Sequence, residues 1–228
     1  MDEELLLKEF VTISGLHNQE KFPEHVLALL GSSLEKWLQM LLQSLGPSQV
    51  HTAEGAIIRG QVYIAASARI EPTAFIQGPA YIGPDTEIRH GAYIRGFFIA
   101  GDDCVVGHDT EVKNTIFLNH VHAAHFAYVG DSILGNQVNL GAGVVCANLK
   151  LNRKTIAIHW NGERIDTTFQ KFGAVIGDGS QIGCNSVTNP GALLGKDVFC
   201  YPCTNIGGII PSRSIVKPNT LNEIIHVE

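Results

Sequence analysis

The strongest constraint on the fold is a six-residue repeat that begins at Ile58. Seven isoleucines each follow the last by six residues, and a small residue stands two positions before most of them. A six-residue period fits neither an α-helix nor strands joined by turns every eight to twelve residues. It is typical of a β-helix in which each hexapeptide forms one flat face with a single inward aliphatic side chain. The isoleucines are Ile58, Ile64, Ile70, Ile76, Ile82, Ile88 and Ile94.

The repeat continues to Ile206, with short steps and one long interruption. Three hexapeptides form one triangular coil, so residues 18 apart are expected to stack at the strand spacing of about 4.8 Å. Five-residue steps, such as the one from Val112 to Phe117, predict irregular corners. Residues 149–175 leave the repeat, and the Asn161-Gly162 pair within them predicts a two-residue β-hairpin. This hairpin should project from the β-helix and could reach a neighbouring subunit.

The predicted fold class is all-β, a parallel β-helix with a short α-helical N-terminal segment. A stripe of leucines between Pro23 and Gly46-Pro47 recurs every three to four residues, which indicates one amphipathic helix, and Met1 to Phe10 suggests a shorter one. The chain from Ser214 is expected to cover the open end, because a solenoid needs a cap. The predicted domains are a helical segment over 1–52, a β-helix over 53–217 with the projecting hairpin at about 149–175, and a C-terminal tail over 218–228.

Composition excludes several classes of function. A net charge of −6 and a pI near 5.9 argue against a nucleic-acid partner, which normally needs a basic face. The acidic start MDEELLLKEF does not resemble a secretory signal, and no run of 18 apolar residues predicts a membrane span. Five scattered cysteines indicate reduced thiols and a cytoplasmic location. The pair Cys200 and Cys203 has redox-motif spacing, but it lacks the βαβ context of such motifs.

The titratable residues concentrate in the middle of the repeat. His108, His120, His122 and His125 fall within eighteen residues. Arg95 and Lys113 are 18 apart, so the repeat would stack them one coil apart unless the short steps shift the register. Two stacked like charges are reasonable around an anion such as a phosphate, and scattered solvated charges are the alternative.

The central motifs resemble a known family. AAHFAYVGDSILG (123–135), QVNLGAG (137–143) and ANLKLNRK (147–154) are similar to the acetyltransferase domain of the bifunctional glucosamine-1-phosphate acetyltransferase/N-acetylglucosamine-1-phosphate uridylyltransferase family. The hairpin and GAVIGDGSQIGCNSVTNPG (173–191) resemble its sugar-1-phosphate nucleotidylyltransferase branch. The similarity covers roughly 55–217 and implies a left-handed coil, contrary to the usual right-handed crossover rule. It also implies a homotrimer with inter-subunit active sites. The family's nucleotide-binding domain has no counterpart in this sequence, so uridylyl transfer is not expected.

The resemblance assigns roles to ten positions. It implies that His125 is the general base and that Ala142, Cys184 and Pro202 contact acetyl-CoA, although a cysteine at 184 and a proline at 202 depart from the family's usual residues. The implied contacts to the amino-sugar phosphate are Arg95 and Lys113 for the phosphate, with Tyr128, Asn139, Asn148 and Lys154 for the sugar.

The implied chemistry suits these residue types. An amino sugar is mostly an ammonium ion at neutral pH and must lose a proton before it attacks a thioester, a task for which histidine is suited. Backbone N–H groups in the glycine-rich corner 141–143 could stabilise the oxyanion. Direct attack needs no metal. The resemblance therefore implies acetyl-CoA as co-substrate and glucosamine-1-phosphate as acceptor, in UDP-N-acetylglucosamine synthesis.

Three alternatives remain open. A γ-carbonic-anhydrase-like enzyme would hold zinc with His90, His120 and His125, and stoichiometric zinc that is lost on His120→Ala would favour it. A non-catalytic β-helix subunit or scaffold would keep the same residues without turnover. A third alternative keeps acetyl transfer but uses galactosamine-1-phosphate or a nucleotide-linked amino sugar as the acceptor.

Overall fold

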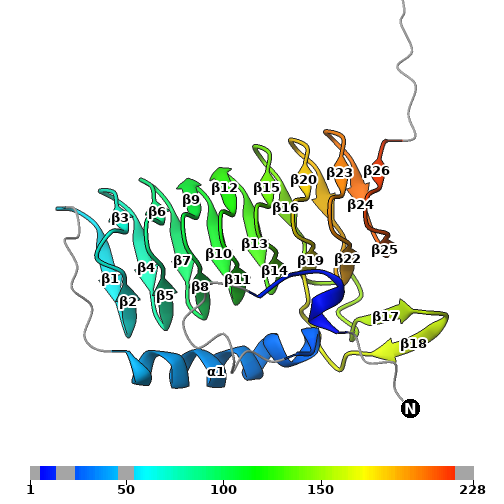
Figure 1. Ribbon diagram of the computed structural model, residues 1–228, viewed down its shortest axis with the longest axis horizontal. Helices are drawn as coiled ribbons and strands as arrows, with labels where there is room; N and C mark the ends of the chain where they lie inside the picture. The colour runs from blue at the N-terminus through cyan, green and yellow to red at the C-terminus, as the bar shows by residue number, and fades with distance from the viewer. Residues whose placement is uncertain (1–5, 14–23, 46–53, 219–228) are drawn as a thin grey trace, which may run out of the picture.

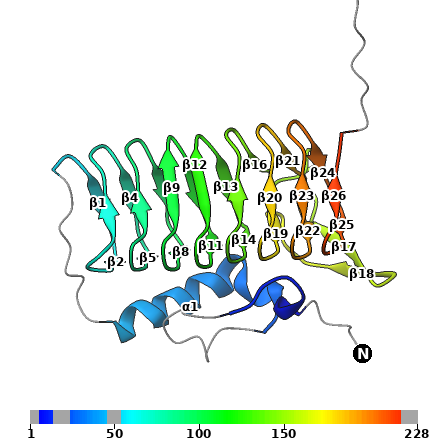
Figure 2. The same ribbon diagram turned by 45° about the horizontal axis from the view of Figure 1, so that its top comes forward.

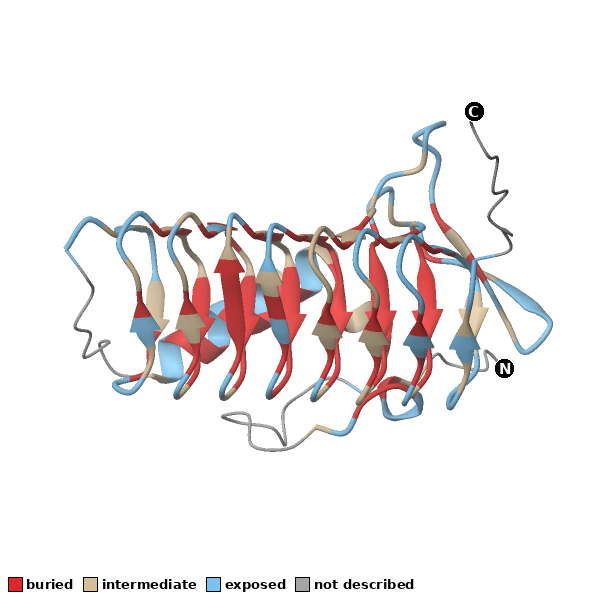
Figure 3. Cartoon of the chain, turned by 90° about the horizontal axis from the view of Figure 1, so that it is seen from above, coloured by how far each residue is buried: buried red, intermediate tan, exposed pale blue. Residues whose placement is uncertain are grey.

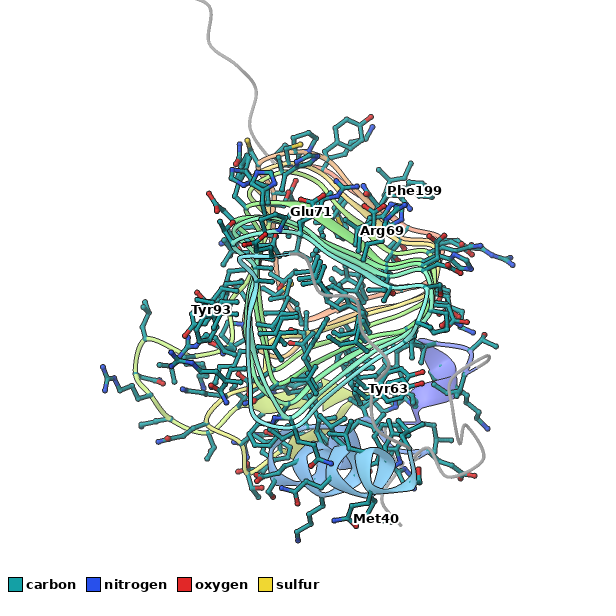
Figure 4. The ribbon with its side chains drawn as sticks, turned by 90° about the vertical axis from the view of Figure 1, so that its left-hand side faces the viewer. Met40, Tyr63, Arg69, Glu71, Tyr93 and Phe199 are labelled. Atoms are coloured by element: carbon teal, nitrogen blue, oxygen red, sulfur yellow. The ribbon has the colours of Figure 1, made fainter. Side chains whose placement is uncertain are left out.

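The computed structural model, which describes residues 6–13, 24–45 and 54–218, is a left-handed parallel β-helix with one α-helix against it (Figure 1). Three parallel sheets of eight strands each form three faces of a triangular coil. We call them face 1, face 2 and face 3, in the order in which the chain meets them. Figure 4 views the β-helix from one end, along its axis, and labels Tyr93 on face 1, Tyr63 on face 2 and Arg69 on face 3. The predicted fold class is confirmed.

The strands are short, two to four residues each, because every face ends at a corner. Face 1 contains β1 (Ile57–Arg59), β4 (Phe75–Gln77), β7 (Tyr93–Arg95), β10 (Glu111–Lys113), β13 (Tyr128–Gly130), β16 (Val145–Cys146), β21 (Val187–Thr188) and β24 (Asn205–Ile206). Face 2 contains β2 (Val62–Ile64), β5 (Ala80–Ile82), β8 (Phe98–Ala100), β11 (Thr115–Phe117), β14 (Ile133–Leu134), β19 (Ala174–Ile176), β22 (Ala192–Leu194) and β25 (Ile209–Ile210). Face 3 contains β3 (Arg69–Ile70), β6 (Glu87–Ile88), β9 (Val105–His108), β12 (His122–His125), β15 (Asn139–Leu140), β20 (Gln181–Ile182), β23 (Phe199–Cys200) and β26 (Ile215–Val216).

The six-residue repeat supplies the interior of the coil. Six of the seven isoleucines are at most 4% exposed, and Ile58, in the first coil, packs against them while partly exposed. Full burial of one such side chain stabilises the fold by about 1.5–3 kcal/mol relative to exposure. Figure 3 shows the buried strands alternating with more exposed corners. Many corner residues have positive φ, and aspartate and asparagine, which tolerate this conformation, are frequent among them.

The five-residue steps do not disturb the stacking. Ile94, Val112 and Val129 occupy one register on neighbouring strands of face 1, although the last step is one residue short of a full coil. The omitted residue is absorbed at a corner. Ile94 and Val112 are paired, and the next residue of each strand is Arg95 or Lys113. The two cations therefore end adjacent strands in the same register, and their predicted stacking is confirmed.

Helix α1 (Gly31–Ser44) runs along face 2 (Figure 2). The face-2 strands are apolar on both sides, because their outward side chains, such as Ile99 and Ile116, pack against α1 and the segments before it. The predicted single helix is interrupted: a 3-10 helix η3 (Val26–Leu29) comes first, and Leu30 is extended, with φ −118° and ψ 158°. This break leaves both Leu29 and Leu30 fully buried.

The remaining N-terminal expectations have mixed outcomes. In place of a helix up to Phe10, the structure has one 3-10 turn, η1 (Leu7–Glu9), and Leu6 forms an antiparallel bridge with His25. Pairing with a strand-like neighbour therefore outweighs helix formation in this short segment. Pro23 and Gly46-Pro47 lie outside the described residues.

The predicted hairpin is confirmed as β17 (Ala157–Trp160) paired with β18 (Glu163–Asp166). Its turn residues Asn161 and Gly162 have φ values of 49° and 84°, as a type I′ turn requires. The hairpin projects beyond the coils (Figure 1), and its base packs against the chain's own N-terminal segment. The rings of Phe10 and Trp160 are 5.6 Å apart.

The expected cap from Ser214 is wrong for the described part of the chain. Strand β26 pairs in parallel with β23, so Ile215 and Val216 extend face 3 by one more strand. Apolar residues at the spacing of the coil continue the sheet in preference to folding over its end. Residues 219–228 lie outside the described residues. Among the described helices, none is both long and apolar enough to cross a membrane.

Candidate active site

One corner, between face 3 and face 1, stacks the candidate base with the candidate cofactor contacts. The register that pairs His122 with Asn139 places His125 beside Ala142. In the same way, the pairing of the following strands places Ala142 beside Cys184 and Cys184 beside Pro202, so that these residues form one column. A backbone ladder follows it: Phe126 N–H donates to His108 O (2.7 Å) and Gly143 N–H to His125 O (3.2 Å). Asn185 N–H donates to Ala142 O (2.8 Å). The column, in coil order, is His90, His108, His125, Ala142, Cys184 and Pro202.

His125 is exposed at this corner. Its imidazole makes no hydrogen bond or ion pair to any residue that the structure describes, so a substrate can approach it. The next residue, Phe126, has φ 35° and is 55% exposed. A bulky side chain in this left-handed conformation is strained, and such strain is concentrated at functional sites.

A group of cations lies on face 1. Arg95 Nη1 contacts Glu111 Oε1 at 2.7 Å, and this hydrogen bond raises the pKa of the Arg95 guanidinium. The pKa of Lys113 is lowered, first by partial burial and then by the nearby charges of Lys171 and Arg95, while the Asp131 carboxylate opposes the shift. Three cations and the carboxylates of Glu111 and Asp131 therefore lie close together on face 1.

A buried carboxylate organises the polar residues beside these cations. Asp131 is 3% exposed and accepts hydrogen bonds from Asn114 Nδ2 (2.9 Å) and Asn148 Nδ2 (2.5 Å). The same Asn148 amide nitrogen lies 3.2 Å from Tyr128 Oη, to which it donates. Burial raises the pKa of Tyr128, and the Asp131 and Glu111 charges add to the effect. The predicted residues Tyr128 and Asn148 are thus brought together.

Gly130 forms the floor of this polar group. A Cβ added there would lie 2.6 Å from Tyr128 Oη and 2.7 Å from Asn148 Nδ2. Both polar atoms therefore lie directly over the glycine, and Gly130 pairs with Lys113 on the neighbouring strand. A side chain at position 130 would clash with both polar atoms and displace them.

A groove of about 440 Å³ runs along face 3 on the other side of the His125 corner. Three of the predicted residues line it: Asn139, Cys184 and Pro202. Its other lining residues are Gly141, Gln181, Ile182, Gly183, Phe199, Cys200 and Tyr201. Figure 4 shows Phe199 on this outer surface. The mixture of apolar side chains and glycine backbone suits an extended chain with amide groups, rather than a charged ligand.

The expected oxyanion donors are corrected by the backbone ladder. Gly141 N–H donates to Ile182 O (2.8 Å) and Gly143 N–H to His125 O (3.2 Å), so neither is available to a ligand. Both N–H groups form the hydrogen bonds that hold neighbouring coils together. Among the described residues, Ala142 N–H has no hydrogen-bond partner, and it belongs to the same column as His125.

Two predicted sugar contacts lie apart from the polar group of face 1. The first is Asn139, which lines the groove of face 3, and the second is Lys154. It lies in the exposed loop before the hairpin, where its backbone N–H donates to Asn152 Oδ1 at 3.0 Å. Its ammonium group has no hydrogen bond or ion pair within the described ranges 6–13, 24–45 and 54–218.

The histidines considered for zinc are dispersed in the chain. His90 pairs with Glu71 at 3.2 Å and stacks on His108, while His120 pairs with Asp103 at 3.0 Å. In the part of the chain that the structure describes, no three His, Cys, Asp or Glu side chains are grouped to hold a metal ion.

Four residues of the site were missed in the sequence analysis: Glu111, Gly130, Asp131 and Lys171. Asp131 carried a detectable signal, since Asn114, Asp131 and Asn148 recur every 17 residues, the length of the shortened coils. Lys171 carried no periodic signal, because it follows the hairpin.

Sequence comparisons bear on the same coils. The family model described as the GMPPB C-terminal domain matches residues 76–161, which include His125 and the face-1 group up to Asn148. A bifunctional sugar-1-phosphate nucleotidylyltransferase/acetyltransferase of Sulfurisphaera tokodaii is 35% identical over 96 residues, 42% of this chain and 24% of the relative. The bifunctional protein GlmU of a Synechococcus strain is 36% identical over 118 residues, 52% of this chain and 16% of the relative. These matches confirm the resemblance, and the chain spans a quarter or less of these relatives.

Solved structures show a more distant likeness. The acetyltransferase domain of PglB from Neisseria gonorrhoeae, in complex with acetyl coenzyme A, is 16% identical with a TM-score of 0.40. The match covers 93% of this chain and 83% of that chain. A likeness at this level carries no information about the ligands of the present chain.

Proposed function

We propose that this chain is an acetyl-CoA-dependent N-acetyltransferase that acts on an amino-sugar phosphate, with glucosamine-1-phosphate as the acceptor and UDP-N-acetylglucosamine synthesis as its context. The observation that carries the proposal is the position of His125. It lies at a corner between the cationic group of face 1 and the groove of face 3. An anionic acceptor and a thioester donor would meet at that corner.

In the proposed reaction, His125 removes a proton from the acceptor ammonium. The free amine attacks the thioester carbonyl, a C–N bond forms and the C–S bond breaks. The nitrogen gives up its remaining extra proton, and the CoA thiolate takes up one proton as it leaves, so that the products are the amide and the CoA thiol. Ala142 N–H is our candidate donor to the oxyanion, because it is unpaired among the described residues and shares the column of His125. Arg95 and Lys113 hold the phosphate, while Tyr128, Asn148, Asn139 and Lys154 contact the sugar.

The groove is the proposed acetyl-CoA site. Its apolar lining and glycine backbone suit the pantetheine arm, with Cys184 and Pro202 along its length. The sequence relatives support the assignment, since one of them is named a bifunctional sugar-1-phosphate nucleotidylyltransferase/acetyltransferase.

We also propose a cytoplasmic homotrimer with active sites between subunits. Face 2 is covered by α1, whereas faces 1 and 3 carry exposed apolar residues next to the site. Tyr93, Phe126 and Phe199 are 43%, 55% and 49% exposed. Contact between copies would cover such residues and bring Lys154 of one copy toward a neighbouring site. All five cysteines are free thiols, as a cytoplasmic location favours.

Release of CoA from acetyl-CoA should depend on an amino-sugar phosphate. A thiol reagent would follow release with glucosamine-1-phosphate, galactosamine-1-phosphate, unphosphorylated glucosamine and no acceptor. Turnover with one phosphorylated acceptor, and much less with glucosamine, is expected because the face-1 cations bind the phosphate. Equal rates with glucosamine would contradict the phosphate site. No release with any acceptor would favour the scaffold alternative.

Cys184 should report occupancy of the groove. Cys184 and Cys203 are exposed, while burial raises the pKa of Cys104 to about 12 and that of Cys146 to about 11. The thiolate is the reactive form, so only the exposed pair should react with iodoacetamide in the folded protein. Acetyl-CoA should slow alkylation of Cys184 by about ten-fold or more in Cys203→Ser protein, as measured by peptide mass spectrometry. Unchanged alkylation at saturating acetyl-CoA would place the cofactor elsewhere.

A further inference from the structure

We infer that Cys184 and Cys203 are a redox-sensitive pair: a small-molecule disulfide such as oxidised glutathione converts them to an intramolecular disulfide that weakens acetyl-CoA binding in the groove of face 3. Formation of the disulfide follows from the geometry of two neighbouring coils. Its effect on acetyl-CoA rests on the proposed function, because the groove is the proposed cofactor site. In intracellular proteins, such disulfides are usually transient and act as redox sensors.

The sequence spacing suggested a different pair, Cys200 and Cys203, which the structure disfavours. Cys200 lies in β23 with its side chain in the interior of the coil, 6% exposed, and burial raises the pKa of its thiol to about 11. Cys104 and Cys146 are buried as well, whereas Cys184 and Cys203 are exposed. All five cysteines lie among the described residues, so Cys184 is the one exposed thiol of the same chain with which Cys203 can pair.

Backbone pairing places Cys184 and Cys203 side by side on neighbouring coils. Strand β20 pairs with β23, and the same register, continued by two residues, sets Cys184 beside Pro202. The Cys203 N–H donates to Cys184 O at 2.8 Å. Adjacent strands lie about 4.8 Å apart and one further residue adds about 3.5 Å, so the two Cα atoms are roughly 6 Å apart. Disulfides join Cα atoms that are about 4.4–6.8 Å apart.

The corner conformation directs the Cys203 side chain toward the coil of Cys184. Cys203 has φ 56°, and Asn185, the equivalent residue one coil earlier, has φ 55°. The Asn185 side chain turns back onto the preceding coil, where its Oδ1 occupies the place that a Cβ on Gly143 would take, and Asp109 behaves in the same way at the same corner. The same conformation therefore turns Cys203 toward the coil whose Cys184 lines the groove.

The disulfide forms by two exchange steps. One cysteine thiolate attacks oxidised glutathione, a protein–glutathione disulfide forms, and one glutathione thiolate leaves. The other cysteine thiolate then attacks the protein sulfur of this mixed disulfide, so that the Cys184–Cys203 bond forms and the second glutathione leaves. Two protein thiols are thereby oxidised, and one oxidised glutathione is reduced to two glutathione thiols, which take up the two protons that the cysteines lose.

The disulfide changes the wall of the proposed acetyl-CoA site. Cys184 lies between Ala142 and Pro202 in the column, and it lines the groove. A bond to Cys203 adds a second sulfur to this side chain and fixes it against the next coil, so the pantetheine arm would no longer meet the wall that it meets in the reduced protein. We expect the dissociation constant of acetyl-CoA to be about ten-fold higher in the disulfide form.

The pair is tested first on the full chain without substrate. Reduced protein would be equilibrated with mixtures of reduced and oxidised glutathione, its remaining thiols blocked with iodoacetamide, and its tryptic peptides examined by mass spectrometry without reduction. We expect a peptide that links Cys184 to Cys203, which dithiothreitol removes, in wild-type protein and in the matched control Cys200→Ala. In Cys203→Ser, one glutathione should instead remain bound to Cys184. Circular dichroism of the reduced variants would check their fold, and non-reducing electrophoresis should show single chains.

Acetyl-CoA binding is then measured by isothermal titration without an acceptor. Acetyl-CoA is the probe because free CoA has a thiol that would reduce the disulfide. The dissociation constant should rise in oxidised wild-type protein, return to its original value after dithiothreitol, and behave in the same way in Cys200→Ala. Reduced Cys203→Ser should bind acetyl-CoA as reduced wild-type protein does, since Cys203 does not line the groove.

Each part of the inference has a result that would overturn it. If no linked peptide forms, if it disappears in folded Cys200→Ala, or if the link joins two chains, Cys184 and Cys203 are not an intramolecular pair. If the link forms and acetyl-CoA binds equally well to both forms, the disulfide does not control the groove. Failure of the reduced protein to bind acetyl-CoA would instead contradict the proposed function, while the linked peptide would still confirm the pair.

Discussion

His125→Ala should lower kcat for acetyl transfer by roughly 10²–10⁴-fold, the usual cost of losing a general base. Without the imidazole, the acceptor stays an ammonium ion, whose nitrogen has no lone pair for attack on the thioester. KM for the phosphorylated acceptor should change little, because the face-1 cations are untouched. Steady-state kinetics with a thiol readout, at saturating acetyl-CoA, would measure both parameters.

His90→Ala is the matched control for this variant. His90 belongs to the same column, two coils away, and stacks on His108 with ring centroids 4.4 Å apart. It should retain turnover within about three-fold of wild type, as a residue outside the reacting centre does. A loss below ten-fold for His125→Ala, with unchanged thermal stability, would remove His125 from the role of base. Equal losses in both variants would point to a disturbed corner rather than to lost chemistry.

Gly107→Ala should be among the most destabilising single changes in the coil. A Cβ at this position would lie 1.8 Å from Ala124 O and 2.1 Å from Ala124 C, both backbone atoms of the adjacent strand β12. Strands β9 and β12 would have to separate, at an expected cost of about 3 kcal/mol or more in the free energy of unfolding. Because His125 ends β12, turnover should fall as well. Urea denaturation at fixed protein concentration would measure the change in stability.

Gly162→Ala is the control that separates the cost of a steric clash from the cost of an unfavourable backbone conformation. Gly162 has φ 84°, but no atom lies within 4 Å of an added Cβ, so only conformational strain of about 1–2 kcal/mol is expected. Gly107→Ala should unfold at a clearly lower urea concentration than Gly162→Ala. The reverse order would mean that the two coils are not packed as closely at Gly107 as described here.

The coil itself could be predicted from the sequence because its determinant is local and periodic. Each inward aliphatic side chain defines one face, so the spacing of Ile58 to Ile94 predicts the length of each face and the stacking register within that stretch. The five-residue steps left the register uncertain, and only the pairing of Val112 with Ile94 and Val129 resolved it. Handedness came from the family resemblance, since an aliphatic repeat specifies burial and not the direction of the turn.

The N-terminal segment was less predictable, because tertiary contacts decide its shape. The leucine spacing is continuous through Leu30, yet the helix begins only at Gly31. Burial of Leu29 and Leu30 against the outward residues of face 2 overrides the local helical pattern. The partner of Trp160 was likewise hidden, because Phe10 lies 150 residues earlier in the chain.

The site was predictable where it follows the coil and not where it leaves it. Stacking alone could place Arg95 beside Lys113, and the register carries His125 to Ala142. The sequence predicted more free oxyanion donors than the structure has. The residue spacing does not show that the N–H groups of Gly141 and Gly143 donate hydrogen bonds to neighbouring coils. Lys171 reaches the site through an antiparallel bridge with no relation to the six-residue period.

The insertion between β16 and β19 leaves the stack on either side of it in register. Val145 still pairs with Val187, and Ile133 with Val175, although the inserted segment lies between them. One segment beside the polar group of face 1 therefore belongs to an insertion that the stacking of the coils does not require. Exchanging residues 149–171 for a loop of another length or charge should change the surroundings of Asn148 while the aliphatic interior and the imidazole of His125 keep their places. Diversification of such proteins needs no change in the repeat.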